Sequence, residues 1–185
     1  HFQDLLRIIL AASGQARRIN VFMPYLYEGR QYRRNARESL DCAAMLKELF
    51  QLGISNFLTF DAHDGRVANS VPTKNFENLS SSYQIIEAMI HTIPDLTLLP
   101  GRFMVVSPDE SGVSRAVYYA SMLEVPLGIF YRKRDYLQTV HGRNPVVGQK
   151  FLGDDVQGLD ILLVDDMIVT GETMLRVACD LKARG

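Results

Sequence analysis

The sequence predicts an α/β protein built on doubly wound parallel sheets, and three observations support this prediction. Short apolar runs of strand length alternate with amphipathic segments of helical length along the 185 residues, which is the order that βαβ units need. The hydrophobic share of 47% with 22% charged residues is typical of a chain that buries a core. Polar residues follow directly after most predicted strands, where parallel sheets bind their ligands.

The first part of the chain contains two helix predictions and two strand predictions. A helix is expected over residues 2–12, and a strand over residues 18–23 ends at Pro24 because proline cannot continue the backbone hydrogen bonding. After a polar, basic loop, residues 39–50 show an apolar stripe with helical spacing, and Gly53 is expected to cap that helix. A buried strand and a long loop follow, at residues 54–60 and 61 to about 80.

The second part continues the alternation of helices and strands. Helices are predicted over residues 81–90, 111–123 and 172–183, and strands over residues 103–107, 127–131 and 161–164. A long polar stretch, up to about residue 148, separates the last two strands. The two cysteines are far apart in the sequence and fall in predicted helices, so they are expected to be buried thiols: Cys42 and Cys179.

The composition excludes several classes of partner. The 20 Lys and Arg residues balance 21 Asp and Glu residues, and the net charge is −1. The chain as a whole therefore has no general attraction to nucleic acid or to an anionic membrane. No apolar run reaches the roughly 18 residues of a membrane span. The absence of a disulfide framework and of a signal peptide in the sequence predicts a cytoplasmic protein.

The strongest local motif is ILLVDDMIVTGET, at residues 161–173. It reads as a strand, a pair of acids, and a short turn that opens a helix. Backbone N–H groups at a helix N-terminus, together with the hydroxyls of Thr170 and Thr173, form a cradle for a phosphate monoester. Gly171 leaves room for the phosphate to approach the backbone closely.

The acid pair of this motif needs a separate explanation, because carboxylates next to such a cradle would repel a phosphate. Asp165 and Asp166 are interpreted as holding sugar hydroxyls, or a cation, at a fixed distance from the phosphate. The alternative is purely structural, with the two acids ending a strand and Thr170 capping a helix.

This segment resembles the phosphoribosyl-diphosphate (PRPP) binding loop of type I phosphoribosyltransferases and of ribose-phosphate diphosphokinases, also called PRPP synthetases. The resemblance implies that Asp165 and Asp166 hold the ribose hydroxyls of ribose 5-phosphate. It also implies that the turn binds the 5-phosphate through Thr170, Gly171, Glu172 and Thr173.

Three further segments resemble the diphosphokinases specifically. They contain the Arg30-Gln31 pair, the Asp61-Ala62-His63 element and the Ser107-Pro108-Asp109 element. Their order and spacing match that family through essentially the whole chain, whereas simple phosphoribosyltransferases have only the PRPP loop. The resemblance implies that Arg30, Gln31 and His63 bind ATP, and that His63 and Asp109 meet the metal, Mg²⁺.

A basic run at the end of the strand before the long polar stretch resembles the catalytic cations of the same family. The resemblance implies that Arg132, Lys133 and Arg134 stabilise the charge on the transferring phosphates from a mobile lid. Arg132 stands where the family has its catalytic lysine. The structural alternative is a solvated, charged start of a loop.

Structural alternatives also apply to the other segments. The basic loop with Arg30 and the tyrosines around it also reads as a solvated turn or as a nucleic-acid patch. His63 also reads as an ordinary hydrogen-bonded residue, and Asp109 as a helix cap. Besides Arg132, the chain departs from the usual family pattern at Tyr32 and Val169, where acids are common, at Ser111, where glycine is common, and at Glu172, where small residues are common.

The function implied by the resemblance is transfer of the β,γ-diphosphoryl group of Mg-ATP to the 1-hydroxyl of ribose 5-phosphate. Two alternatives stay open, a catalytically silent regulatory partner of such an enzyme and a phosphoribosyltransferase that consumes PRPP. ATP and ribose 5-phosphate are the expected partners, without nucleic acid or membrane. A homo-oligomer is expected, either a hexamer or a dimer-based assembly.

The resemblance also predicts the domain organisation. Residues 1–75 correspond to the C-terminal part of a first phosphoribosyltransferase-like domain, with the ATP-binding elements. Residues 76–185 correspond to the N-terminal part of a second, with the ribose 5-phosphate loop. Both units are therefore expected to be incomplete in this chain, and the chain alone is not expected to be active.

Overall fold

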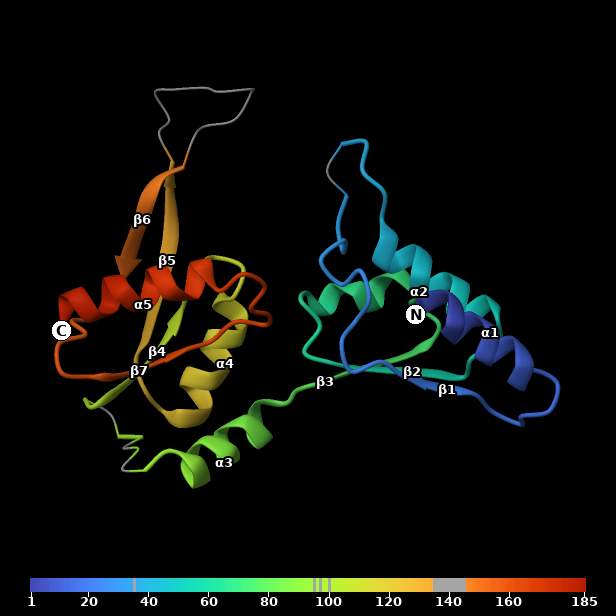
Figure 1. Cartoon of the computed structure of the whole chain (residues 1–185), viewed down its shortest axis with the longest axis horizontal. Helices are drawn as coiled ribbons and strands as arrows, with labels where there is room; N and C mark the ends of the chain where they lie inside the picture. The colour runs from blue at the N-terminus through green and yellow to red at the C-terminus, as the bar shows by residue number, and fades with distance from the viewer. Residues whose placement is uncertain (35, 95, 97, 100, 135–145) are drawn as a thin grey trace. The chain divides into compact units, whose positions relative to one another are not determined.

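The computed structural model describes residues 1–34, 36–94, 96, 98–99, 101–134 and 146–185, and for residues 132–134 and 146–147 it describes the backbone only. The chain forms two compact units, His1–Ile86 and Glu87–Gly185 (Figure 1). Each unit has its own parallel or mostly parallel sheet. This arrangement confirms the predicted α/β class.

The first unit is a three-stranded parallel sheet in the order β1-β2-β3. Two helices pack on one face of this sheet and bury Leu6 and Ile9 from α1 and Leu46 and Leu49 from α2, against Phe57 of β2. The elements of the unit are α1 (Phe2–Ala12), β1 (Asn20–Phe22), α2 (Asp41–Gln51), β2 (Asn56–Phe60), a 3-10 helix η1 (Gly65–Ser70) and β3 (Asn75–Leu79).

The predicted cap of α2 is confirmed in its essentials. Leu52 ends the helix, and Gly53 follows with φ of 91°, the left-handed conformation that glycine adopts without a steric penalty. Its N–H donates to the carbonyl of Phe50 at 3.1 Å. The chain can therefore reverse immediately into β2.

β3 corrects the prediction of a continuous loop over residues 61–80. The segment pairs in parallel with the whole of β2, from Asn56 opposite Asn75 to Phe60 opposite Leu79. At the start of the sheet, Asn56 donates its amide to Asn20 at 2.6 Å, and Asn75 donates to Asn56 at 2.8 Å. The strand was missed because its side chains are mostly exposed and polar, so no hydrophobic alternation marks it.

The second unit is a four-stranded sheet in the order β6-β5-β4-β7. β4 lies inside the sheet, pairs in parallel with β5 and β7, and is buried at every residue. Met104 and Val106 of β4 pack in one cluster with Val177 and Leu181 of α5. The strands and helices of this unit are β4 (Phe103–Ser107), α4 (Val113–Leu123), β5 (Leu127–Arg134), β6 (Val146–Leu152), β7 (Asp160–Leu163) and α5 (Glu172–Arg184), while α3 (Ser82–Thr92) begins in the first unit.

β6 is the second strand that was not predicted. It pairs antiparallel with β5, from Ile129 opposite Leu152 to Arg134 opposite Val146, so the second sheet is not wholly parallel. β5 also continues through the basic residues that were expected to start a loop. Backbone pairing in an antiparallel ladder does not require apolar side chains, which explains why both features escaped the sequence analysis.

The boundary between the compact units falls between Ile86 and Glu87, within α3. β3 belongs to the first unit because it pairs with β2. The predicted assignment of residues 1–75 and 76–185 to two domains stays a prediction. Among the described residues, no helix is long and apolar enough to cross a membrane.

The cysteines behave differently from each other. Cys42 is buried in α2, as predicted, and burial raises the pKa of its thiol to about 11. Cys179 is exposed on α5, so the prediction of a buried thiol was wrong there. α5 contacts the sheet through only one side, and Cys179 does not lie on the stripe formed by Val177 and Leu181.

Candidate functional site

In the second unit, the predicted site residues meet at the carboxyl ends of β4 and β7. The two strands are parallel neighbours, and the pairing continues beyond β7, where the N–H of Val164 donates to the carbonyl of Val106 at 3.1 Å. Ser107 and Asp109 therefore emerge beside Asp165 and Asp166. This edge is the usual ligand position in a parallel α/β sheet.

Asp109 organises the turn into α4. Its Oδ1 accepts hydrogen bonds from the backbone N–H of Ser111 at 2.8 Å and of Gly112 at 3.3 Å, and from the Ser111 hydroxyl. The structural alternative for Asp109, a cap at the start of a helix, thus describes part of what its carboxylate does. One carboxylate oxygen is used in this way, and the charge of the group still acts on its neighbours.

Gly112 allows the close approach of three segments at this edge. A Cβ on Gly112 would stand 2.9 Å from the Ser107 hydroxyl and 3.9 Å from a carboxylate oxygen of Asp165. It would also stand 3.5 Å from the carbonyl oxygen of Val164. The position therefore fits glycine, and the start of α4 lies directly against the end of β7.

Asp165 and Asp166 form a compact acidic group. The N–H of Asp166 donates to Oδ1 of Asp165 at 2.8 Å, and the Asp166 carboxylate lies 3.7 Å from the guanidinium of Arg115 on α4. Burial raises the pKa of Asp165, and the neighbouring charges of Asp166 and Asp109 raise it further. A group of acids under mutual repulsion is suited to accept hydrogen bonds from hydroxyls or to face a cation.

The Thr/Gly turn after the acids opens α5 in a conformation that exposes its backbone. Gly171 has φ of 76°, and the helix begins with the N–H of Leu175 donating to the Gly171 carbonyl at 2.9 Å. The Thr170 hydroxyl accepts from the N–H of Glu172 at 3.3 Å, but the N-cap of α5 is Gly171, and no side chain caps the helix there. The flanking Val169 is 69% exposed, which leaves the turn open to an anion.

Glu172 differs from the other residues of this turn because its side chain is negative. Its carboxylate accepts from Arg176, one turn later on α5, at 3.0 Å. That ion pair turns the charge toward the helix rather than toward the turn. Glu172 would therefore contribute its backbone N–H to a bound phosphate, and Thr173 its hydroxyl.

In the first unit, the loops after β1 and β2 meet through two rings. Arg30 and Gln31 lie in the exposed loop after β1, where the N–H of Gln31 donates to the Glu28 carbonyl at 2.8 Å. His63 follows β2, and its ring centroid lies 5.6 Å from that of Tyr32. The predicted nucleotide-binding residues Arg30, Gln31 and His63 are thus brought onto neighbouring loops of one unit.

Some predicted residues are not brought together by what the structure describes. The backbone of Arg132, Lys133 and Arg134 forms the end of β5, and their side chains lie outside the described part of the structure. Arg30, Gln31 and His63 belong to the first unit, and the other predicted site residues belong to the second. Each group is therefore described by itself.

Two arginines at these edges were not predicted. Arg66, on η1, pairs with Asp64 and lies over the Tyr32 ring, with its guanidinium carbon 5.8 Å from the ring centroid. Arg115 pairs with Asp166. The Arg115–Asp166 pair joins segments that are far apart in the sequence, and the Arg66–Asp64 pair depends on the local turn into η1. The one signal in the sequence is an arginine in the first turn of the helix that follows Gly112.

The acids of the second unit fit a cation that arrives with phosphate groups. Among the described residues, no three side chains of metal-binding types lie close enough to hold an ion by themselves. Mg²⁺ is commonly bound by one or two carboxylates together with substrate phosphates and waters. Burial raises the pKa of Asp165, and the negative charges of Asp166 and Asp109 raise it further, so a cation at this edge would offset those charges.

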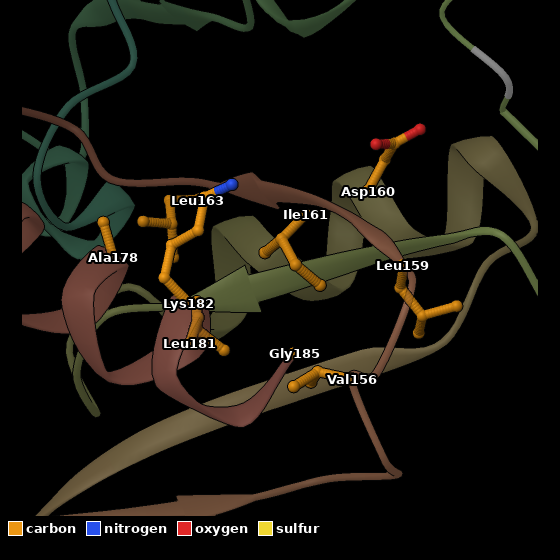
Figure 2. Close-up of a pocket in the computed structure, with 9 residues that line it drawn as sticks. All are labelled: Val156, Leu159, Asp160, Ile161, Leu163, Ala178, Leu181, Lys182 and Gly185. Carbon is orange, nitrogen blue, oxygen red and sulfur yellow. The ribbon is translucent and has the colours of Figure 1, made fainter.

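A hollow that the structure describes in the second unit lies elsewhere. A groove of about 320 Å³ lies between β7 and the C-terminal half of α5. Figure 2 shows the side chains that line it, among them the apolar Ile161, Leu163 and Leu181. Its charged residues are Asp160 and Lys182. The groove lies along β7 itself, whereas the acids and the Thr/Gly turn follow the end of that strand.

Comparison with known proteins gives three findings. The family model described as phosphoribosyl transferase domain matches residues 73–185. A ribose-phosphate pyrophosphokinase of Wolinella succinogenes is 30% identical over 98% of the chain and 54% of its own length. A ribose-phosphate pyrophosphokinase of Bradyrhizobium diazoefficiens is 31% identical over 100% of the chain and 55% of its own length.

A solved structure agrees with these sequence matches. The phosphoribosylpyrophosphate synthetase from Mycobacterium smegmatis superposes with a TM-score of 0.80 at 25% identity, over 100% of this chain and 56% of that one. The chain thus spans about half the length of the curated relatives it matches. The similarity extends over both compact units.

Proposed function

The chain belongs to the phosphoribosyl transferase domain family, and from this premise we propose that it supplies the nucleotide and ribose-phosphate sites of a ribose-phosphate diphosphokinase. The names of the relatives that match nearly the whole chain support this proposal. The main structural support is the edge of the second sheet, where Asp165 and Asp166 lead directly into the Thr170-Gly171 turn and α5.

In the proposed reaction, the 1-hydroxyl oxygen of ribose 5-phosphate forms a bond to the β-phosphorus of ATP. The bond from that phosphorus to the oxygen bridging the α- and β-phosphates breaks, so that AMP leaves and the hydroxyl proton is released. The protein needs to align the hydroxyl with the phosphorus and to neutralise charge on the phosphate oxygens.

The second unit would hold the acceptor. The hydroxyls of Thr170 and Thr173 and the backbone N–H groups at Gly171 and Glu172 would bind the 5-phosphate at the start of α5. The carboxylates of Asp165 and Asp166 would accept hydrogen bonds from the ribose hydroxyls. Such contacts fix the distance between the 5-phosphate and the 1-hydroxyl, which is the alignment that the reaction requires.

The first unit would hold the donor. Arg30 and Gln31 offer a planar fork and an amide for the phosphates and base of ATP, and His63 lies on the neighbouring loop. The second unit would supply the cations that offset the charge developing on the transferring group. These are Arg132, Lys133 and Arg134, at the end of β5. Mg²⁺ would arrive with the nucleotide and neutralise phosphate charge, and the residues proposed to meet it are His63 of the first unit and, separately, Asp109 of the second.

One contact favours a second candidate, a catalytically silent regulatory partner within such an assembly. The Arg115 guanidinium lies 3.7 Å from the Asp166 carboxylate, and both side chains are mostly buried, so part of the charge of that carboxylate is already compensated within the protein. The silent partner would keep the fold and the binding loops without turnover. A cytoplasmic location and a homo-oligomer also belong to the proposal.

The test is formation of AMP from ATP and ribose 5-phosphate with Mg²⁺, measured on the longer protein that contains this chain. The diphosphokinase proposal expects AMP and PRPP in equal amounts, and an Asp165→Ala, Asp166→Ala double variant with turnover reduced at least about 100-fold. The matched control is Asp154→Ala, an exposed acid away from this edge. Absence of AMP with retained binding to an active relative would replace the proposal by the silent partner.

A phosphoribosyltransferase makes a different pattern of products. It would release diphosphate from PRPP in the presence of a base and would form no AMP from ATP. The same samples, supplied with PRPP instead of ATP and ribose 5-phosphate, therefore separate the two enzyme classes.

A further inference from the structure

The loops after β1 and β2 meet on the ring of Tyr32. The guanidinium carbon of Arg33 lies 5.5 Å from the ring centroid and that of Arg66 lies 5.8 Å from it. The imidazole of His63 lies 5.6 Å away, between centroids, at an interplanar angle of 57°. One aromatic side chain therefore contacts three nitrogen-bearing groups, one from its own loop and two from the loop after β2.

Arg66 is held in place by more than this ring. Asp64 caps η1 by accepting from the backbone N–H of Arg66 at 2.9 Å, and its two carboxylate oxygens also accept from the Arg66 side chain. The paired guanidinium lowers the pKa of Asp64 below its usual value, despite an opposing effect of burial. Asp64 is 15% exposed, whereas Arg66 remains 73% exposed. The arginine is thus anchored at one edge and open to solvent elsewhere.

The group has a net positive charge. Arg33 and Arg66 contribute two positive charges and Asp64 one negative charge, which leaves +1 with His63 left out of the sum. A cavity of about 240 Å³ opens beside the group, with Tyr32 and Arg66 in its wall and the first turn of α2 opposite them. An anion could enter there and meet the guanidinium of Arg66, since the cavity is open to solvent.

We propose that Tyr32 is a positioning residue that orients His63 and Arg66 toward the phosphate chain of the nucleotide, and that Arg66 is an additional phosphate-binding residue. The inference rests on the proposed binding of ATP by Arg30, Gln31 and His63. A ring face attracts a guanidinium without using its N–H groups. Nε and Nη2 of Arg66 already donate to Asp64, so the N–H groups of its exposed side chain that do not face Asp64 are the ones that would meet a phosphate oxygen.

Tyr32 is suited to this task because it packs on the core while its ring faces the two loops. It is partly buried against the cluster that holds α2 and the strands. The position of the ring is therefore fixed by packing, and the ring in turn restricts the positions of the side chains that contact it. An acid at this position would instead pair with the arginines directly and would compete with phosphate for their N–H groups.

The test compares Tyr32→Phe, Tyr32→Leu and Arg66→Gln in the longer protein. Phe keeps the ring face, while Leu keeps the packing but removes the face. Binding of ADP and of a non-hydrolysable ATP analogue would be measured by calorimetry at low and moderate salt. We expect Tyr32→Phe to bind like the wild type, and the other two to lose about tenfold in nucleotide affinity with a smaller salt dependence.

Two controls match the variants. Arg7 is 74% exposed and pairs with Asp4 on α1 at 3.1 Å, so Arg7→Gln removes the same kind of exposed ion pair away from the loops. Tyr83→Leu replaces a tyrosine that is 61% exposed on α3. Both are expected to bind nucleotide like the wild type. Thermal melting is measured for each variant to confirm that it is folded.

The kinetics add a readout that simple destabilisation would not produce. Tyr32→Leu should raise KM for ATP and leave KM for ribose 5-phosphate unchanged, and the Tyr32→Leu, Arg66→Gln double variant should be no weaker than Arg66→Gln alone. The inference would be overturned if the wild type binds nucleotide and Tyr32→Leu binds it equally well, or loses no more affinity than Arg7→Gln does. The proposed function would then still stand. A wild-type protein that binds no nucleotide would overturn both.

Discussion

The Arg115 guanidinium lies 3.7 Å from the carboxylate of Asp166. The contact joins the first turn of α4 to the segment that follows β7, and both side chains are mostly buried, at 17% and 11% exposure. Asp165 stands next in the chain, with a pKa raised by burial and by the negative charges around it. Arg115 is therefore the cation that compensates this acidic edge in the described structure.

Replacement of Arg115 by Gln should destabilise the second unit more than an ordinary surface change. The substitution leaves Asp166 partly buried with less compensation, which costs about 1–3 kcal/mol when access to water is allowed for. The free energy of unfolding in urea at pH 7 measures the effect. The control is Arg176→Gln, since the Arg176–Glu172 pair on α5 is 56% and 77% exposed and should contribute less than about 0.5 kcal/mol. Equal losses in the two variants would contradict the assigned role of Arg115.

The charge of Asp165 should lower the free energy of unfolding at neutral pH but not at acid pH. The reference is a variant with a neutral residue at position 165. Its folded-state pKa is raised above the ordinary 3.8, chiefly by burial. A group with a raised pKa contributes its full stability below the unfolded-state pKa, and that contribution is lost as the pH rises through the folded-state pKa. Asp165→Asn should therefore be more stable than the wild type at pH 7, by less than about 1 kcal/mol because the carboxyl stays partly in water.

The pH series supplies the decisive comparison for Asp165. The gain from Asp165→Asn should shrink steadily as the pH falls toward the ordinary pKa of 3.8, because the wild-type carboxyl becomes protonated in the folded state first and then in the unfolded state. Thermal melting from pH 3.5 to pH 7.5 follows it, with exposed Asp154→Asn as the control. A gain that stays constant over this range would show that the charge is not its cause. The same variant should bind ribose 5-phosphate less tightly, because one acceptor of the proposed site has become an amide.

The elements that were predicted from sequence are those with a strong periodic pattern. α2 is an example, because its buried face, from Cys42 to Phe50, follows the helical spacing in the sequence. β3 and β6 were missed because they are held by backbone ladders to β2 and β5, while many of their side chains are exposed or polar. Backbone pairing is a tertiary property, and no local pattern reports it.

The candidate site divides in a similar way. Asp165, Asp166 and the turn at Thr170 and Gly171 are contiguous, so the sequence contained their arrangement almost completely. The proximity of Asp109 depends on the pairing of β4 with β7, which could be inferred only once a parallel sheet was assumed. The ion pairs of Arg66 and Arg115, in contrast, depend on side-chain directions that sequence spacing does not determine.

Thr59 should be a site where removal of a polar group stabilises the protein. The side chain is fully buried in β2, and among the residues that the structure describes its hydroxyl has no hydrogen-bond partner. Thr59→Val removes the unsatisfied hydroxyl with little change in shape and should raise stability by about 1 kcal/mol, or the melting temperature by roughly 2–4 °C. Thr59→Ser keeps the hydroxyl and removes a methyl group, so it should lower stability by about 1 kcal/mol. Changes of the same sign in the two variants would contradict this explanation.

Gly128 of β5 should tolerate no larger residue, because the ring of Phe151 on β6 occupies the space beside it. A Cβ at Gly128 would stand 2.5 and 2.6 Å from two ring atoms of Phe151, and that ring packs on Phe130 with centroids 5.2 Å apart. Gly128→Ala should therefore cost about 1–3 kcal/mol, since the ring has to move within the core. Gly148 of β6 has no atom within 4 Å of its built Cβ, so Gly148→Ala should change stability by less than about 0.5 kcal/mol.

The cause of the loss at Gly128 can be tested by giving the new methyl group room. Phe151→Leu removes the ring atoms that a Cβ at Gly128 would meet. Phe151→Leu should lower the free energy of unfolding less in the Gly128→Ala background than in the wild type. The reason is that the clash relieved by the smaller side chain exists only in the Gly128→Ala background. A double-mutant cycle by urea denaturation measures this coupling. Strictly additive costs would mean that the strain lies in the backbone of β5, which pairs at this position with Val106 of β4, rather than in contact with the ring.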